Sequence, residues 1–178
     1  MTHQNPSHDP TRTPVVCIVY NRPILTRGLI ARLRQIKPRR VLIIADGPKP
    51  NKISDRAACL QTRHETEQID WECCVDRDYS DVNLGCSERV LSGLDWAFTL
   101  VDRAIILEDD IDAHPIFFSW ATQMLKAYEG RSDVAMIGGH NPLARWPVSS
   151  ACDACIASRR GSISGWATWR DRWQAVPG

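Results

Sequence analysis

Three consecutive acidic residues, Glu108, Asp109 and Asp110, directly follow the apolar run Ala104 to Leu107. Neighbouring carboxylates repel one another, and a divalent cation relieves that repulsion most directly. Mg²⁺ and Mn²⁺ bind carboxylate oxygens, and a cation held by only one or two protein carboxylates completes its shell with water and substrate phosphates. This acidic cluster therefore predicts a metal-bridged diphosphate. The alternative interpretation of the three acids is a solvated acidic turn that binds no metal.

The spacing of the acids predicts different contacts for each of them. Side chains alternate along a strand, so Glu108 and Asp110 are expected to face one way and Asp109 the other. Asp112 is a second candidate ligand beside Asp110. It also suits a cap for a helix that begins at Pro115, because proline favours the first helical position and acids are favourable near a helix N-terminus.

Five apolar, β-rich runs are predicted to form the strands that position these acids. They are Val15–Tyr20, Val41–Ala45, Asp70–Val75, Ala104–Leu107 and Val134–Gly139. Most stretches between them carry apolar residues at helical spacing. Strands that alternate with helices imply right-handed βαβ crossovers, so the predicted fold is α/β, a mostly parallel sheet with helices on both faces.

Polar residues follow three of these strands where each strand ends. Asn21-Arg22 comes after the first strand, Asp46 after the second, and the acidic cluster after the fourth. In open parallel sheets, ligands bind outside the carboxyl ends of the strands. These residues are far apart in the sequence and are predicted to meet at one edge of the sheet.

The bulk composition fits one domain of 178 residues with a formal net charge of +1. That balance gives no indication of nucleic-acid binding. No run of 18 or more apolar residues is present, so no transmembrane helix is predicted. Residues 1–14 are polar and proline-rich and are expected to form a disordered leader before a domain spanning residues 15–178.

The seven cysteines are scattered rather than spaced like a disulfide framework. They are expected to be reduced thiols in the cytoplasm, with peripheral attachment to a membrane left open. Cys152 and Cys155 form a CxxC motif, but no second CxxC completes four zinc ligands. A structural zinc site is therefore the minority interpretation.

The segment IILEDD followed by HPIFF resembles the metal-binding segment of nucleotide-sugar glycosyltransferases with the GT-A fold. NLGCSERVLSGLDWAF (Asn83 to Phe98) and GWATWRDRW (Gly165 to Trp173) flank it. In this order the segments resemble bacterial sugar transferases sometimes labelled hemolytic-protein-like. More distantly, the chain is similar to N-acetylglucosaminyltransferase I. The resemblance spans Val15 to Trp173.

The resemblance implies a Rossmann-like GT-A architecture and a metal-dependent, inverting transfer. The sugar would pass from a nucleoside-diphosphate sugar, with a UDP-sugar favoured, to a hydroxyl of a glycan or other acceptor. It also implies roles for residues at matching positions. These are Asp110 as ligand to Mn²⁺ or Mg²⁺, Asp109 near the ribose, Glu108 near the transferred sugar, Asp46 at the base, Arg22 near the diphosphate, and Gly85, Arg89 and Trp166 around the donor.

Several of these residues have a simpler interpretation. Arg22 could only hold a turn, Asp46 in Asp-Gly-Pro is a good turn residue, and Arg89 is more often a solvated helix residue. Of Trp166 and Trp169, we expect one to pack in the core and one to line the site.

The general base that inverting transfer requires is a carboxylate located after the Gly-Trp segment in the resembling proteins. Here the chain ends at Gly178, and Asp171 lies too early and on an expected helix. The base is therefore expected beyond Gly178, and the domain is expected to lack the usual C-terminal part. Two alternatives follow: a truncated, non-catalytic relative that binds nucleotide or only folds, and, less favoured, a nucleotidyltransferase.

Overall fold

The computed structural model describes residues 9, 11–140 and 157–175. The elements follow one another along the chain as β1 (Val15–Val19), α1 (Pro23–Ile36), β2 (Arg40–Ala45), α2 (Ile53–Thr66), β3 (Cys74–Tyr79), α3 (Cys86–Leu100), β4 (Arg103–Glu108), α4 (Pro115–Ala127), β5 (Ile137–Gly138), β6 (Trp166–Trp169) and α5 (Arg170–Gln174). This alternation of strands and helices confirms the predicted α/β class.

One six-stranded sheet has the strand order β3-β2-β1-β4-β6-β5. Its β3, β2, β1 and β4 run parallel, whereas β6 is antiparallel to both β4 and β5. The chain moves outward from β1 to β3 and then crosses to β4 on the other side of β1. The order of the strands therefore reverses between β1 and β4, the position at which open α/β sheets bind ligands.

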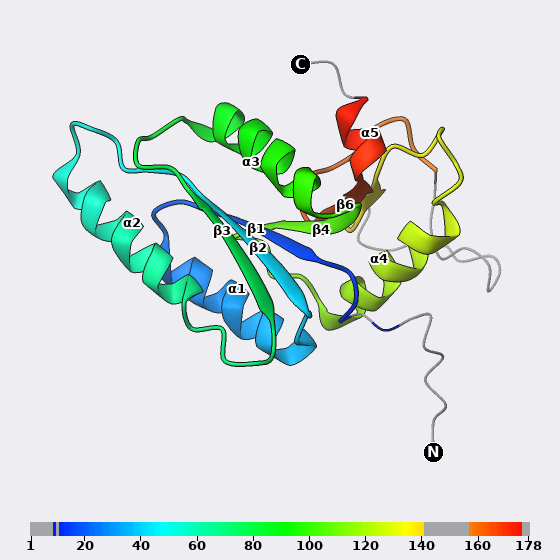
Figure 1. Ribbon diagram of the computed structural model, residues 1–178, viewed down its shortest axis with the longest axis horizontal. Helices are drawn as coiled ribbons and strands as arrows, with labels where there is room; N and C mark the ends of the chain where they lie inside the picture. The colour runs from blue at the N-terminus through cyan, green and yellow to red at the C-terminus, as the bar shows by residue number, and fades with distance from the viewer. Residues whose placement is uncertain (1–8, 10, 141–156, 176–178) are drawn as a thin grey trace.

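Helices cover both faces of the sheet, with α3 and α5 on one side and α1 and α2 on the other (Figure 1). Side chains alternate along the strands, so each strand serves both layers. Cys17 and Leu107 pack in the core beneath α1 and α4. Val16 and Ile106 pack with Phe98 on the α3 side. The mostly parallel, doubly covered sheet is thus as predicted.

The third strand lies later in the chain than the predicted Asp70–Val75. β3 begins at Cys74, which pairs with Arg40, and runs on to Tyr79. It is an edge strand and has only β2 as a neighbour. Its side chains are therefore exposed or half-buried rather than apolar throughout, and a search for continuous apolar runs misses it.

The far edge of the sheet also differs from the prediction. The fifth strand, predicted as Val134–Gly139, is only Ile137–Gly138 and lies at the edge of the sheet beyond β6. The WATW segment forms β6, which no β-rich apolar run predicted. Trp166 and Trp169 project to opposite faces, and each joins a different core cluster. Burial by neighbouring elements, rather than local periodicity, makes this segment a strand.

Two helices begin at proline, as expected from its fixed backbone angle. Pro23 opens α1 and Pro115 opens α4. The predicted cap of α4 by Asp112 is wrong, because the side chain of His114 accepts from the backbone N–H of Ile116. Asp112 instead forms an ion pair with Arg32 of α1 at 2.6 Å.

Part of the segment expected to be a leader belongs to the domain. The backbone N–H of Arg39 donates to the carbonyl of Thr11, and that of Ile105 donates to the carbonyl of Pro14. The hydroxyls of Thr13 and Thr122 are 2.7 Å apart. These hydrogen bonds hold residues 11–14 against the domain. The segment lacks the run of apolar side chains from which the sequence could have predicted that attachment. None of the described helices is long and apolar enough to cross a membrane.

Candidate functional site

The carboxyl ends of β1 and β4 bring Arg22 beside the acidic cluster. The strands pair in parallel, with Ile18 opposite Glu108, so the chain leaves both strands at the same edge. Arg22 lies just before Pro23, which starts α1 there. Residues separated by 87 positions in the sequence thereby come into direct contact.

The guanidinium of Arg22 bridges Asp109 and Asp110. Its Nε donates to Asp109 Oδ2 at 3.3 Å, its Nη2 pairs with Asp109 Oδ1, and its Nη1 donates to Asp110 Oδ2 at 3.0 Å. The predicted opposite orientation of the two aspartates is wrong. β4 ends at Glu108, and the backbone N–H of Ile111 closes a turn onto the Glu108 carbonyl, so strand alternation stops before Asp109.

The three acids of the cluster differ in burial and in charge compensation. Burial raises the pKa of Asp109, and Arg22 opposes that rise. Burial also raises the pKa of Glu108, and the charge of Asp110 adds to the rise. Within the described residues, the Glu108 carboxylate has no hydrogen-bonding or ion-pair partner, while the Asp110 side chain is 45% exposed. One cation therefore faces three carboxylates, and negative charge remains in excess.

We predict that Arg22→Met destabilises the fold by about 2 kcal/mol, because it leaves the buried Asp109 carboxylate without its counter-charge. Methionine preserves much of the apolar stem. Urea unfolding measures the loss. The double variant Arg22→Met/Asp109→Asn should recover most of it, because the buried charge is gone. Additive losses in that double-mutant cycle would contradict the pairing.

Asp46 holds the loop of residues 80–85 against the end of β2. Its Oδ1 accepts from the backbone N–H groups of Gly47 at 2.8 Å and Leu84 at 2.9 Å. Its Oδ2 accepts from Asn83 Nδ2 at 2.8 Å and the Gly85 N–H at 3.2 Å. The buried carboxylate thus has four donors, all from the protein.

Two glycines permit this close contact. A Cβ at Gly47 would overlap the backbone of Val82, so only glycine fits there. Gly85 has φ +85° at the N-terminus of α3, a conformation that side chains disfavour. The loop of residues 80–85 therefore lies directly on the end of β2.

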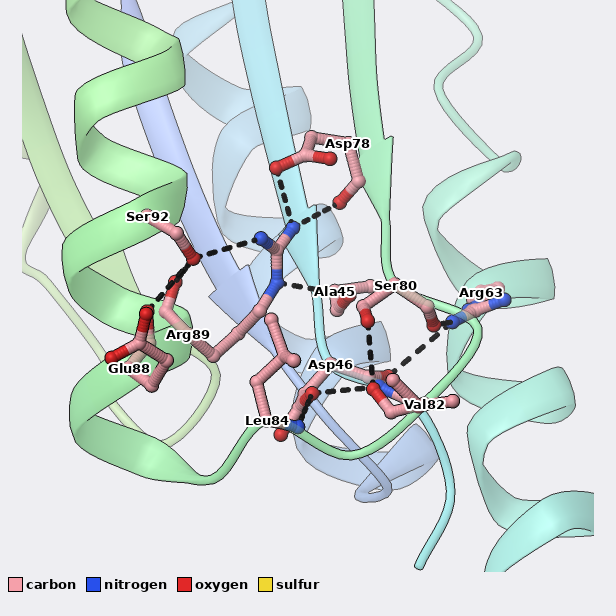
Figure 2. A network of polar contacts seen from close by, with 11 residues as sticks. Ala45, Asp46, Arg63, Asp78, Ser80, Val82, Leu84, Glu88, Arg89 and Ser92 are labelled. Carbon is pink, nitrogen blue, oxygen red and sulfur yellow. Dashed lines mark hydrogen bonds and ion pairs between the residues drawn. The ribbon is translucent and has the colours of Figure 1, made fainter.

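Arg89 is buried, so its interpretation as a solvated helix residue is wrong. Its Nε donates to the carbonyl of Ala45 at 3.2 Å. Its Nη2 donates both to the backbone carbonyl of Asp78 at 2.6 Å and to the Asp78 carboxylate at 2.7 Å. Figure 2 shows the guanidinium reaching from α3 to the ends of β2 and β3, with Arg63 approaching Ser80 from the other side. Both arginines fix the strand ends that carry Asp46 and the loop of residues 80–85.

Sequence patterns did not identify Asp55, a buried acid in the first turn of α2. It accepts from Tyr20 Oη, from Asn21 Nδ2 and from the backbone N–H of Lys49 at 2.9 Å. Burial would raise the pKa of Asp55, but these donors outweigh it and lower the pKa to about 2. A signal was available: α2 is mostly polar, and Asp55 is the acid in its first turn.

Neither tryptophan of β6 offers an open face for stacking on a sugar. Trp166 is 8% exposed and lies 6.3 Å from the ring of Trp173. Trp169 is buried, and its Nε1 donates to the Leu125 carbonyl at 3.2 Å. The expectation that one of the two would line the site is therefore not met, because both are core side chains.

The predicted site residues thus fall into two groups at one edge of the sheet. Arg22 contacts Asp109 and Asp110, with Glu108 adjoining them; Asp46 contacts Gly85, and Arg89 supports the same loop. Among the described residues, no hydrogen bond or ion pair joins the two groups. Cys152 and Cys155 lie outside the described residues.

Across residues 9, 11–140 and 157–175, no three His, Cys, Asp or Glu side chains gather in a geometry that could hold a metal ion. Any cation at this edge would therefore depend on fewer protein ligands and on oxygens from its substrate. A scan against models of known protein families and a search of curated proteins both find no match to this chain.

Proposed function

We propose that the protein is a metal-dependent glycosyltransferase that binds a nucleoside-diphosphate sugar, with a UDP-sugar favoured, where the strand order reverses between β1 and β4. The observation that carries the proposal is the contact of Arg22 with Asp109 and Asp110, next to a Glu108 carboxylate that has no hydrogen-bonding or ion-pair partner among the described residues. The positively charged guanidinium of Arg22 and an excess of carboxylates thus lie where α/β sheets bind ligands.

The acidic cluster fits a divalent cation with few protein ligands. Asp109 is occupied by Arg22, but Asp110 uses only Oδ2 in that bridge and keeps Oδ1. Beside the effect of burial, the negative charge of Asp110 lies close enough to raise the pKa of Glu108. A cation on Asp110 would relieve that repulsion, and Mg²⁺ or Mn²⁺ with one or two carboxylates takes further oxygens from phosphates. A bound cation would neutralise charge on the leaving diphosphate.

Arg22 has donors left for a phosphate. A guanidinium carries five N–H groups, and three of them point to the two aspartates. The remaining donors belong to a half-exposed side chain at the edge of the sheet. Arg22 would therefore orient the diphosphate while Asp109 fixes the guanidinium from the buried side, which is electrostatic stabilisation prepared before binding.

The transfer step rests on the resemblance of the EDD, NLGC and GWATW segments to GT-A enzymes. The acceptor would be a glycan or other hydroxyl, and its deprotonation requires a general base. We assign no residue of this chain to that role. Asp171, the acid on α5, is paired with Arg172, which lowers its pKa.

The test is thermal unfolding with UDP or GDP, with Mn²⁺ or with EDTA. A nucleotide at a hundred times its Kd should stabilise the fold by about 2.7 kcal/mol, or roughly 5 to 10 °C in Tm. We expect this shift only with Mn²⁺, and we expect Asp110→Asn to abolish it. A full shift in EDTA, or no shift with any nucleotide, contradicts the proposal.

The matched control is Asp112→Asn. This carboxylate lies two positions further along and pairs with Arg32, so its loss should leave the nucleotide shift intact. Release of UDP from UDP-sugars in the presence of hydroxyl acceptors then separates transfer from binding. Metal-dependent binding without transfer would favour the non-catalytic alternative.

A further inference from the structure

We propose that the loops after β1, β2 and β3 form a docking surface for an anionic lipid membrane. The surface consists of Ile24, Ile53 and Val82 together with the basic residues Lys49, Lys52 and Arg56, and these six residues are called the basic rim. It does not include the acidic cluster, and its existence does not depend on the proposed function.

Two buried carboxylates join the three loops into one surface. Asp55 of α2 binds Asn21 after β1 and the backbone of Lys49 after β2. Asp46 binds the loop of residues 80–85 after β3. Because each loop is fastened to the next, the backbone positions of the three loops are held together at the carboxyl edge of the sheet.

The apolar side chains of the basic rim are unusually exposed. Ile53 is 96% exposed, Ile24 is 78% exposed and Val82 is 62% exposed. Ile24 and Ile53 occupy the first turns of α1 and α2, and Val82 lies on the loop before α3. All three therefore lie exposed at the carboxyl end of the sheet, whereas exposed apolar residues on a protein surface are usually scattered singly.

The exposed charges on these loops are almost all positive. Five basic side chains and one acid are exposed in residues 20–27, 46–56 and 80–85, all of which the structure describes. The basic residues are Arg22, Arg27, Lys49, Lys52 and Arg56, and the acid is Asp81. The other acids there, Asp46 and Asp55, are buried. The chain as a whole has a net charge of only +1, so these three loops are locally basic, although the acidic cluster after β4 lies at the same end of the sheet.

Two of the basic side chains, Lys49 and Arg56, are available to an outside partner, and Lys52 has only a long ion pair. Arg22 and Arg27 are engaged with Asp109 and Glu65. Lys49 and Arg56 have no ion pair within the described part of the chain, and Lys52 is 3.9 Å from the buried Asp55. Lysine and arginine beside exposed isoleucine match a surface of anionic headgroups over acyl chains, where charge and apolar insertion act together.

Vesicle sedimentation without nucleotide tests the docking. We expect binding to vesicles of phosphatidylglycerol and phosphatidylcholine, little binding to phosphatidylcholine alone, and weakening by salt. Removing one basic charge should lower partitioning about fivefold, so Lys49→Gln/Lys52→Gln/Arg56→Gln should lower it about a hundredfold. Ile24→Ser/Ile53→Ser should lower it about tenfold or more.

The matched control removes three positive charges from the opposite edge of the sheet, with Arg12→Gln/Lys37→Gln/Arg39→Gln. It should bind anionic vesicles like the wild type, and circular dichroism checks that each variant is folded. Equal losses in both triple variants, or no binding to anionic vesicles, would overturn the proposal. So would a dimer that Ile24→Ser/Ile53→Ser dissociates, because it would assign the surface to a second copy. Asp110→Asn should bind vesicles normally, so the failure of one proposal is distinguishable from that of the other.

Discussion

Asp46→Ala is expected to destabilise the protein by about 3 to 4 kcal/mol, because it removes a buried carboxylate whose donors all come from the protein. The carboxylate accepts four hydrogen bonds, three of them from backbone N–H groups of Gly47, Leu84 and Gly85. Alanine offers no acceptor, and the loop of residues 80–85 loses its attachment to β2. Urea unfolding gives the free energy, and hydrogen exchange at Leu84 and Gly85 should accelerate.

The effect on the loop can be separated from the effect of charge alone. Asp46→Asn keeps one carbonyl oxygen but directs an amide towards other donors, so its loss should be smaller, about 2 kcal/mol. Asp81→Ala removes an exposed acid of the same loop and should change stability by less than about 0.5 kcal/mol. If Asp46→Ala behaved like Asp81→Ala, the anchoring role of Asp46 would be wrong.

Asp55→Ala is expected to cost about 3 kcal/mol, because the side chains of Tyr20 and Asn21 and the backbone N–H of Lys49 all donate to this carboxylate. Loss of the anchor should also release the turn before α2. Urea unfolding at neutral pH measures the change. Glu67→Ala, at the exposed residue that follows the last turn of the same helix, is the control, with an expected change below about 0.5 kcal/mol.

The same carboxylate should make stability depend on pH. Its donors lower the pKa of Asp55 from 3.8 to about 2, so the folded state binds this proton less readily than the unfolded state. Its stabilisation is therefore fully present above about pH 5 and is lost as the pH falls through the folded pKa, by about 2 kcal/mol in all and roughly half of that by pH 3. The wild type and Asp55→Asn should converge in stability over this range. Parallel curves would contradict the prediction.

Sequence patterns predicted the centre of the fold better than its edges. β1, β2 and β4 are continuous apolar runs because both faces of the sheet are covered, and their positions were found almost to the residue. β3 and β6 were misplaced or missed. An edge strand needs few apolar residues, and the burial of β6 comes from helices that are distant in the sequence.

The candidate site was predictable where it depends on strand ends and unpredictable where it depends on loops. The meeting of Arg22 with the acidic cluster followed from parallel pairing of β1 and β4. The orientation of Asp109 could not be predicted from strand pairing, because a turn replaces the strand after Glu108. The contacts of Asp46 and Asp55 are mainly with backbone N–H groups and neighbouring amides, which carry no signal in side-chain patterns.

The separation of these contacts along the chain has a consequence for folding. Asp55 closes a loop of 35 residues onto Tyr20, and Asp46 closes one of 38 residues onto Leu84, whereas Arg22 meets Asp109 across 87 positions. The entropy cost of closure grows with loop length, and distant pairings form more slowly. The two loop anchors therefore favour early assembly of the β1–β2–β3 half. We therefore expect Asp109 to acquire its counter-charge, and its carboxylate to leave water, only when β4 docks beside β1.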